Sequence, residues 1–153
     1  MLLWNGKLTG KELSFMGNDI LQQWFEKAND DLRSAEYLST MRHPTPDEII
    51  CFHCQQSAEK YLKGFLFLYN IEPPKIHDLD ELLDMCIQIN VSLSILAPKM
   101  HILKTYAVFP RYPNELGISE SDMKTAIQYA KDVREFVMKV IAGIPKEKPI
   151  NSK

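Results

Sequence analysis

The sequence of 153 residues lacks any uncharged apolar run near the roughly 20 residues that a membrane-spanning helix needs. Its first residues also lack the apolar stretch of a signal peptide, because Asn5, Gly6 and Lys7 interrupt it. Cysteine is scarce: three residues, an odd number, predict no disulfide framework. We therefore expect a cytoplasmic protein with no membrane segment.

An excess of charge of one sign is also missing. The formal net charge of −2 argues against a broad nonspecific nucleic-acid surface, which must neutralise many phosphates, although a local basic site stays compatible with it. No phosphate-binding loop, paired-carboxylate site or recognisable Ser/His/Asp set is present, and we predict no cofactor. The length and the 45% of hydrophobic residues fit one ordinary globular domain.

Helical periodicity is the main pattern that is present. Apolar residues recur at three- and four-residue spacing over residues 18–41, which predicts a long amphipathic helix. A second helix is predicted over residues 46–70. Thr45 is its expected N-cap, Pro46 its first helical residue and Glu48 the acid at the third helical position.

Three further helices follow. One is expected to begin near Asp78, and the next to begin with Ser94 as its cap and to reach Tyr106. Ser119 and Asp122 form a pair typical of a capping box, which predicts the start of the last helix.

These segments predict an all-α fold, a compact up-and-down bundle of about five helices. We expect a single domain over residues 18–143. A poorly patterned extension over residues 1–17 would precede it, and a flexible tail over residues 144–153 would follow.

The second helix has two different faces. The face expected in the core carries Ile50, Cys54, Ala58, Tyr61, Leu62, Phe65 and Leu68. The opposite face carries His53, Gln56, Glu59, Lys60 and Lys63, with Phe52 and Phe67 among them. Aromatic residues within a polar face indicate contact with something other than water. A second subunit, a ligand, or both would fit, whereas a solvated face with local ion pairs is the alternative.

Cys51, His53 and Cys54 lie within one turn, which could suggest zinc. However, Cys51 points about 160° away from His53 on a helix, so the two cannot share a small tetrahedral site. We therefore predict buried structural cysteines and no metal.

Two other positions have competing interpretations. Asp78 can cap a helix while His77 packs over the junction, or His77 can lie at a pocket edge as a hydrogen-bonding or acid–base group. Arg111 and Tyr112 lie between prolines in the loop over residues 107–118. Arg111 offers a planar fork for phosphate or carboxylate and Tyr112 a stacking face; alternatively, Arg111 pairs with an acidic residue and Tyr112 packs over the bundle.

Five segments in this order resemble the HEPN (higher eukaryotes and prokaryotes nucleotide-binding) domain family, from about Trp24 to Val140. They are WFEKANDDLRSAEYL, CFHCQQSAEKYLKGFL, HDLDELL, YAVFPRYP and SESDMKTAIQYAKDVREFV. The resemblance implies a helical bundle that dimerises through helices bordering a shared cleft. It also implies a minimal nucleotidyltransferase partner, in some cases as a toxin–antitoxin pair.

Many members of that family are metal-independent ribonucleases with an Arg followed four to six residues later by a His. This chain departs from that pattern, because His43 is adjacent to Arg42 and His101 precedes Arg111. The similarity is to the branch with AEK, HDL and RYP motifs, for which it implies nucleotide binding.

Three functions stay open. The first is a homodimeric module that binds a nucleotide or another phosphorylated ligand beside a nucleotidyltransferase. Its candidate residues are Gln56, Glu59, Lys60, Lys63, His77, Arg111 and Tyr112. The second is a ribonuclease toxin acting on RNA, with His53, His77 or His101 as general acid or base. The third is a protein-interaction subunit without small-molecule chemistry.

Overall fold

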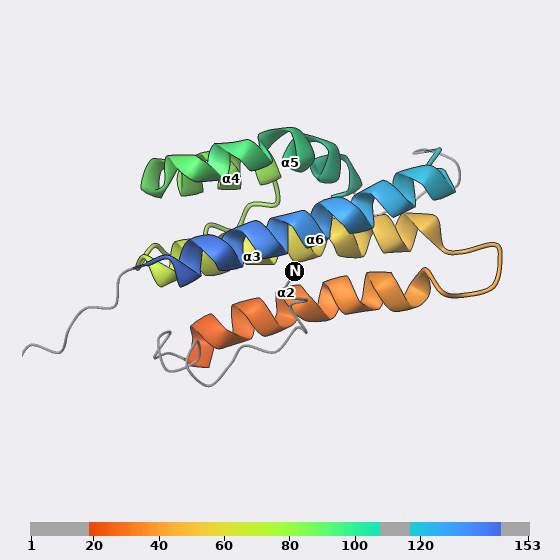
Figure 1. The fold of residues 1–153 in the computed structure, drawn as a ribbon, viewed down its shortest axis with the longest axis horizontal. Helices are drawn as coiled ribbons and strands as arrows, with labels where there is room; N and C mark the ends of the chain where they lie inside the picture. The colour runs from red at the N-terminus through yellow and green to blue at the C-terminus, as the bar shows by residue number, and fades with distance from the viewer. Residues whose placement is uncertain (1–18, 108–116, 145–153) are drawn as a thin grey trace, which may run out of the picture.

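A computed structural model describes residues 19–107 and 117–144 of the chain. Within these ranges the chain forms five α-helices and two short 3-10 helices, and it contains no strand. The predicted all-α bundle is confirmed (Figure 1). The expectations for residues 1–17 and for Arg111 and Tyr112 lie outside the described residues.

The central helix of the bundle is α3 (Asp47–Leu68), which runs antiparallel to α2 (Asp19–Leu38) and contacts every other α-helix (Figure 1). A glycine allows α2 and α3 to come close together, because a Cβ on Gly64 would lie 2.8 Å from Cε1 of Phe25. The predicted core face of α3 is buried, except for Leu68, which is half-buried.

A second layer covers α3. It consists of α4 (Leu79–Ile89), the 3-10 helix η1 (Val91–Leu96), α5 (Ala97–Leu103) and the 3-10 helix η2 (Lys104–Tyr106). The last helix, α6 (Glu120–Ala142), packs along α3. Within the described ranges, every helix is too short or too polar to span a bilayer.

Two helix starts differ from the prediction. Thr45 does not cap α3: the helix begins at Asp47, and Pro46 at the N-cap position provides no side-chain bond. The Thr45 hydroxyl instead donates to the carboxylate of Asp47, which removes it from the helix end. Glu48 is therefore not at the third helical position, and the predicted capping arrangement is wrong.

Ser94 is likewise not a cap, because it lies inside η1. The Asn90 side chain accepts a hydrogen bond from the Ser92 backbone N–H at 3.0 Å, so the chain begins to turn at Val91. The single predicted helix is consequently divided into η1, α5 and η2, with proline in the first turn of α5.

Two other helix starts are confirmed. The Asp78 side chain accepts hydrogen bonds from the backbone N–H groups of Asp80 and Glu81 at 2.9 and 3.2 Å. Ser119 and Asp122 form the predicted capping box at the start of α6, with both reciprocal bonds present. These caps fix where α4 and α6 begin, and the first of them places His77 directly before α4.

Candidate functional site

The polar face of α3 is centred on Glu59, which is only 4% exposed. Its Oε1 lies 2.8 Å from Nζ of Lys63 and 3.0 Å from Nδ1 of His77. Gln55 is fully buried beside it and donates from Nε2 to Oε2 of Glu59 at 3.1 Å. A carboxylate inside the bundle is therefore surrounded by donors from two chain segments.

Local structure explains this arrangement. Glu59 and Lys63 are four residues apart, so they lie on the same side of α3. His77 reaches Glu59 from the linker before α4, and Gln55 Nε2 also donates to the His77 carbonyl at 3.3 Å. The backbone of the linker and the ring of His77 are thus both held against α3.

A second carboxylate, from Asp31 of α2, extends the cluster. It forms a short ion pair with Lys60, and it lies 2.9 Å from Nδ1 of His53. Lys60 Nζ also lies 3.4 Å from Oε1 of Gln56. Gln56 in turn donates to Oε1 of Gln55 at 2.7 Å, which joins the two carboxylate sites.

We call this connected set the Glu59 network. It consists of Asp31, His53, Gln55, Gln56, Glu59, Lys60, Lys63 and His77. With both histidines neutral, two carboxylates balance two ammonium groups. The network therefore carries ordered polar groups without a large net charge.

The pKa of Glu59 shows which influence prevails. Burial by itself raises this pKa, but hydrogen bonds from Lys63 and Gln55, the charge of Lys63 and the contact with His77 lower it below its ordinary value. Glu59 is therefore ionised near neutral pH. Because an ionised carboxylate only accepts hydrogen bonds, Nδ1 of His77 carries a proton and donates to Glu59.

The five described candidate residues from the sequence therefore meet in one network: Gln56, Glu59, Lys60, Lys63 and His77. Asp78 caps α4 as expected, but His77 does not simply pack over the junction. Its side chain is 72% exposed and its Nδ1 contacts Glu59. Phe67 of the same face lies half-buried against the core instead of in the network.

Sequence reasoning missed Asp31 and Gln55. Asp31 belongs to α2, and its contact with Lys60 joins residues 29 positions apart, so no local spacing signals it. Gln55 lies beside Gln56 in the sequence, and the paired glutamines were the one available signal.

The cysteines do not belong to the Glu59 network. All three are buried, and burial raises the pKa of the Cys51 and Cys86 thiols to about 12 and raises that of Cys54 as well. High thiol pKa values disfavour the reactive thiolate. Among the described residues, no group of three His, Cys, Asp or Glu side chains is placed to hold a metal ion.

A related but more exposed set, which we call the exposed set, lies at the start of α4. Asp80 Oδ2 lies 2.7 Å from Nζ of Lys104 and 3.1 Å from Nδ1 of His101. Lys104 Nζ is also 3.5 Å from Asp78, the residue after His77. Burial raises the pKa of Asp80, but bonds from Lys104 and His101 together outweigh it and lower this pKa.

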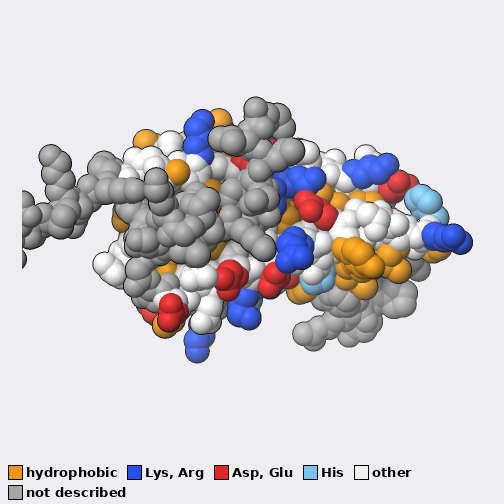
Figure 2. Space-filling model, turned by 60° about the horizontal axis from the view of Figure 1, so that its bottom comes forward, with side chains coloured by type: hydrophobic (Ala, Val, Ile, Leu, Met, Phe, Trp, Pro, Cys, Tyr) orange, Lys and Arg blue, Asp and Glu red, His pale blue; other side chains and the backbone are white. Residues whose placement is uncertain are grey.

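The surface around α2 is mixed in charge. Figure 2, with the underside of the Figure 1 view brought forward, shows Lys and Arg side chains interspersed with Asp and Glu instead of a continuous basic face. This view agrees with a local polar site and gives no support for a broad polyanion surface.

The profile of the HEPN domain family matches residues 21–141. The chain belongs to the HEPN domain family. Two solved structures are similar to this HEPN chain. The crystal structure of TT1696 from Thermus thermophilus has a TM-score of 0.67 and 24% identity, over 80% of this chain and 98% of that one. The crystal structure of ST0689, an archaeal HEPN homologue, has a TM-score of 0.63 and 24% identity, over 79% and 97%.

No curated protein matches the sequence of the chain. At 24% identity, the two solved structures establish the HEPN fold of this chain and nothing about its ligand. A function must therefore be argued from the residues of this HEPN domain itself.

Proposed function

We propose that this HEPN protein is a homodimeric module that binds a nucleotide or another phosphorylated ligand on the polar face of α3, beside a minimal nucleotidyltransferase partner. The observation that carries this proposal is the Glu59 network. It brings Lys60, Lys63 and the exposed ring of His77 together on fixed hydrogen bonds. Such preorganised polar groups are what a specific ligand site requires.

The contacts of Lys60 and Lys63 favour a role other than the phosphate binding that their positive charge suggests. Lys60 and Lys63 are each paired with a carboxylate, so neither offers a full positive charge to a phosphate. We assign them to positioning: Lys63 holds Glu59, and Glu59 holds His77. The ligand would then contact the exposed His77 ring and the half-buried Gln56.

Arg111 would supply the phosphate contact. It lies seven residues after Lys104, whose Nζ is 3.5 Å from the Asp78 carboxylate next to His77. We assign this contact to Arg111 on the chemistry of its guanidinium group. Its planar fork suits a phosphate, and Tyr112 beside it would stack on a base.

Thermal unfolding with a panel of nucleotides tests the proposal. A ligand at about 100 times its dissociation constant stabilises the native state by roughly 2.7 kcal/mol, a shift of a few degrees in Tm. Arg111→Ala and His77→Ala should abolish the shift, whereas Lys124→Ala on an exposed part of α6 should keep it. Absence of a shift with every nucleotide would reject the proposal and favour a protein-interaction subunit.

One observation favours a second function. The contact between Glu59 and His77 orients an exposed imidazole through a buried carboxylate, an arrangement that suits a general acid or base. The protein would then cleave RNA without a metal, with Arg111 stabilising the phosphate in the transition state. RNA cleavage by the wild type that disappears in His77→Ala and in Arg111→Ala would support this function. Cleavage that persists in both would reject it.

A further inference from the structure

A pocket lies where α2 ends and α6 begins, at the end of the bundle that also holds the linker between α2 and α3 (Figure 1). Its volume is about 260 Å³, and its described lining residues are separate from the Glu59 network. One part of the lining is a side of α6 on which Lys124, Ile127 and Lys131 recur at three- and four-residue spacing. The linker adds Met41 and His43. The proposed function leaves this pocket without a role.

Part of the pocket lining is apolar. Met123 of α6 is only 2% exposed, Ile127 is half-buried, and Met41 is 49% exposed. Methionine side chains adapt to the shape of an apolar partner. An apolar group that covers these three residues removes hydrocarbon surface from water, which is favourable. The pocket therefore suits a ligand with a short aliphatic part.

The charged side chains of the lining leave one positive charge in excess. They are the ammonium groups of Lys124 and Lys131 and the carboxylate of Glu120, with His43 neutral. Two positive charges and one negative charge give a net charge of +1. A ligand with a single negative charge complements this excess.

Both lysines can contact a ligand although each has a carboxylate nearby. Lys124 Nζ lies 2.9 Å from Glu120, and their side chains are 69% and 44% exposed. Lys131 Nζ lies 3.4 Å from Glu36, and their side chains are 37% and 38% exposed. Solvent screens such pairs, so they cost little to rearrange. An ammonium group also has three N–H donors, so Lys131 can keep Glu36 and still donate to a ligand.

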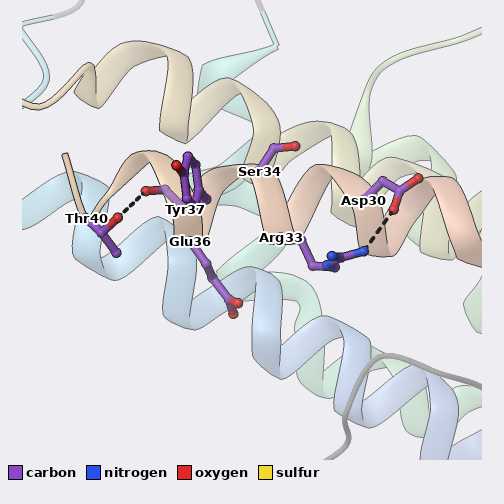
Figure 3. Close-up of a pocket in the computed structure, with 6 residues that line it drawn as sticks. All are labelled: Asp30, Arg33, Ser34, Glu36, Tyr37 and Thr40. Atoms are coloured by element: carbon purple, nitrogen blue, oxygen red, sulfur yellow. Dashed lines mark hydrogen bonds and ion pairs between the residues drawn. The ribbon is translucent and has the colours of Figure 1, made fainter.

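Glu36 also lines a groove on the outer face of α2, where an anion is disfavoured. Figure 3 shows this open groove of about 660 Å³, with the Glu36 side chain directed from α2 towards α6. The charged residues that line the groove are Asp30, Arg33 and Glu36, which give it a net charge of −1. Of these two neighbouring hollows, the pocket beside α6 is therefore the one that attracts an anion.

We propose that the pocket beside α6 binds a small aliphatic carboxylate. The carboxylate group accepts hydrogen bonds from Lys131 and Lys124, and the aliphatic chain covers Met41, Met123 and Ile127. The two lysines are seven residues apart, so their Cα atoms are about 10 Å apart along α6. Two long side chains can close that gap around one anion.

Other ligand classes fit this pocket less well. Its volume is below the roughly 300–1,000 Å³ that is usual for drug-sized ligands, so a nucleotide is too large. A phosphate group would bring more negative charge than the excess of the lining, and an amine would meet a like charge. The pocket is separate from the polar face of α3, so this inference does not rest on the proposed function.

Titration of the full chain with isocaproate, followed by two-dimensional amide NMR spectra, tests the proposal. Signals of residues 123–131 should shift and saturate, with a dissociation constant of the order of a few millimolar for so small a ligand. Isocaproamide has the same shape without the charge and should bind at least about tenfold more weakly. Isohexylamine, which carries a positive charge, and acetate, which lacks the chain, should cause no saturating shift.

Substitutions of Lys131 locate the binding site. Lys131→Met removes the ammonium group but keeps an apolar stem, and it should weaken isocaproate binding by at least about tenfold. Lys131→Arg keeps the charge and should retain binding. Lys139→Met is the matched control, because it removes an exposed ammonium group from the last turn of α6. The dispersion of the amide signals verifies that each variant is folded.

Three results would overturn the proposal. They are an absence of saturable shifts with isocaproate, equal binding of isocaproamide, and wild-type affinity in Lys131→Met. The nucleotide-induced Tm shift should persist in Lys131→Met, whereas isocaproate binding should persist in His77→Ala. A protein that binds isocaproate but no nucleotide would therefore reject the proposed function alone.

Discussion

Glu59 and Asp80 each contact one lysine and one histidine, yet the first carboxylate lies inside the bundle and the second at its surface. The Glu59 side chain is 5% exposed and its partner Lys63 8%. The Asp80 side chain is 34% exposed and its partner Lys104 32%. The two histidines are similar, at 72% and 69% exposed. The main difference is the depth of the ion pair, although Gln55 also donates to Glu59 and Lys104 also lies near Asp78.

This difference separates two physical roles. A buried ion pair gains little over an apolar pair of the same shape, but breaking it leaves a charge in a medium of low dielectric constant. An exposed pair is screened by water and salt, and its loss leaves a charge that water solvates. We therefore expect the Glu59 set to be a structural support for His77, and the Asp80 set to be nearly dispensable for stability.

The largest expected effect is that of Glu59→Ala. It leaves the Lys63 ammonium buried without its carboxylate and should lower the free energy of unfolding by about 3–5 kcal/mol. Urea unfolding at pH 7 measures the change, with Asp80→Ala as the matched exposed control. An equal and small effect of the two substitutions would show that burial does not distinguish the two sets.

Replacing both members of the buried pair sharpens the comparison. The double variant Glu59→Leu/Lys63→Met removes both charges and should recover most of the stability that Glu59→Ala loses, because no unpaired charge is left. The same variant should lose the nucleotide-induced Tm shift, since His77 no longer has the carboxylate that positions it. A double variant as unstable as Glu59→Ala would mean that Gln55 and His77 depend on Glu59 for more than charge balance.

The contribution of ionised Glu59 to the free energy of unfolding should fall over a defined acidic pH range. The pKa of Glu59 is lower in the folded protein than its ordinary value of 4.5, so the folded state prefers the ionised form. The resulting stability is complete above about pH 4.5 and is lost as the pH falls through the folded pKa. The stability difference between wild type and Glu59→Gln, from urea unfolding between pH 7 and pH 3, should therefore narrow below about pH 4.5. A constant difference across this range would contradict the shift.

The fold was predictable because its signals are local and repeated. Apolar spacing along α2, α3 and α6 identified these helices, since a periodic stripe needs no knowledge of what covers it. The Ser119 and Asp122 cap was also correct, because both partners of that bond lie within four residues. The caps assigned to Thr45 and Ser94 were wrong. The Thr45 hydroxyl donates to the Asp47 carboxylate, and the side chain of Asn90 starts the turn ahead of Ser94.

The candidate site was only partly predictable, because some of its contacts join residues that are far apart in the sequence. The polar face of α3 indicated Glu59, Lys60 and Lys63, which lie on one helix. Asp31 comes from α2, and its contact with Lys60 depends on how two helices pack. Nor does the sequence show that Asp31 pairs with Lys60 and Glu59 with Lys63, which is why we propose a positioning role for these lysines instead of phosphate binding.

Asp78→Ala should have a smaller effect on stability. Comparing it with Asp78→Ser distinguishes the capping role of Asp78 from its ion pair with Lys104. Asp78 accepts two backbone N–H bonds at the start of α4, so its loss should cost about 1 kcal/mol. Asp78→Ser keeps a capping oxygen without the charge and should recover most of that stability in urea unfolding. If Asp78→Ser were as unstable as Asp78→Ala, the carboxylate charge near Lys104 would be the important feature instead.

The smallest expected effect is that of Asp80→Asn. The substitution removes the charge opposite Lys104 and His101 but keeps the shape of the side chain, and water solvates the cations that lose their partner. The urea midpoint at pH 7 should be nearly that of the wild type, and nucleotide binding should persist because the Glu59 network is untouched. Raising the salt concentration should not change the difference measurably, since little pairing energy is left to screen. A large loss of stability in Asp80→Asn would place the exposed set in the same structural class as the buried one, and exposure would then no longer explain the contrast between Glu59 and Asp80.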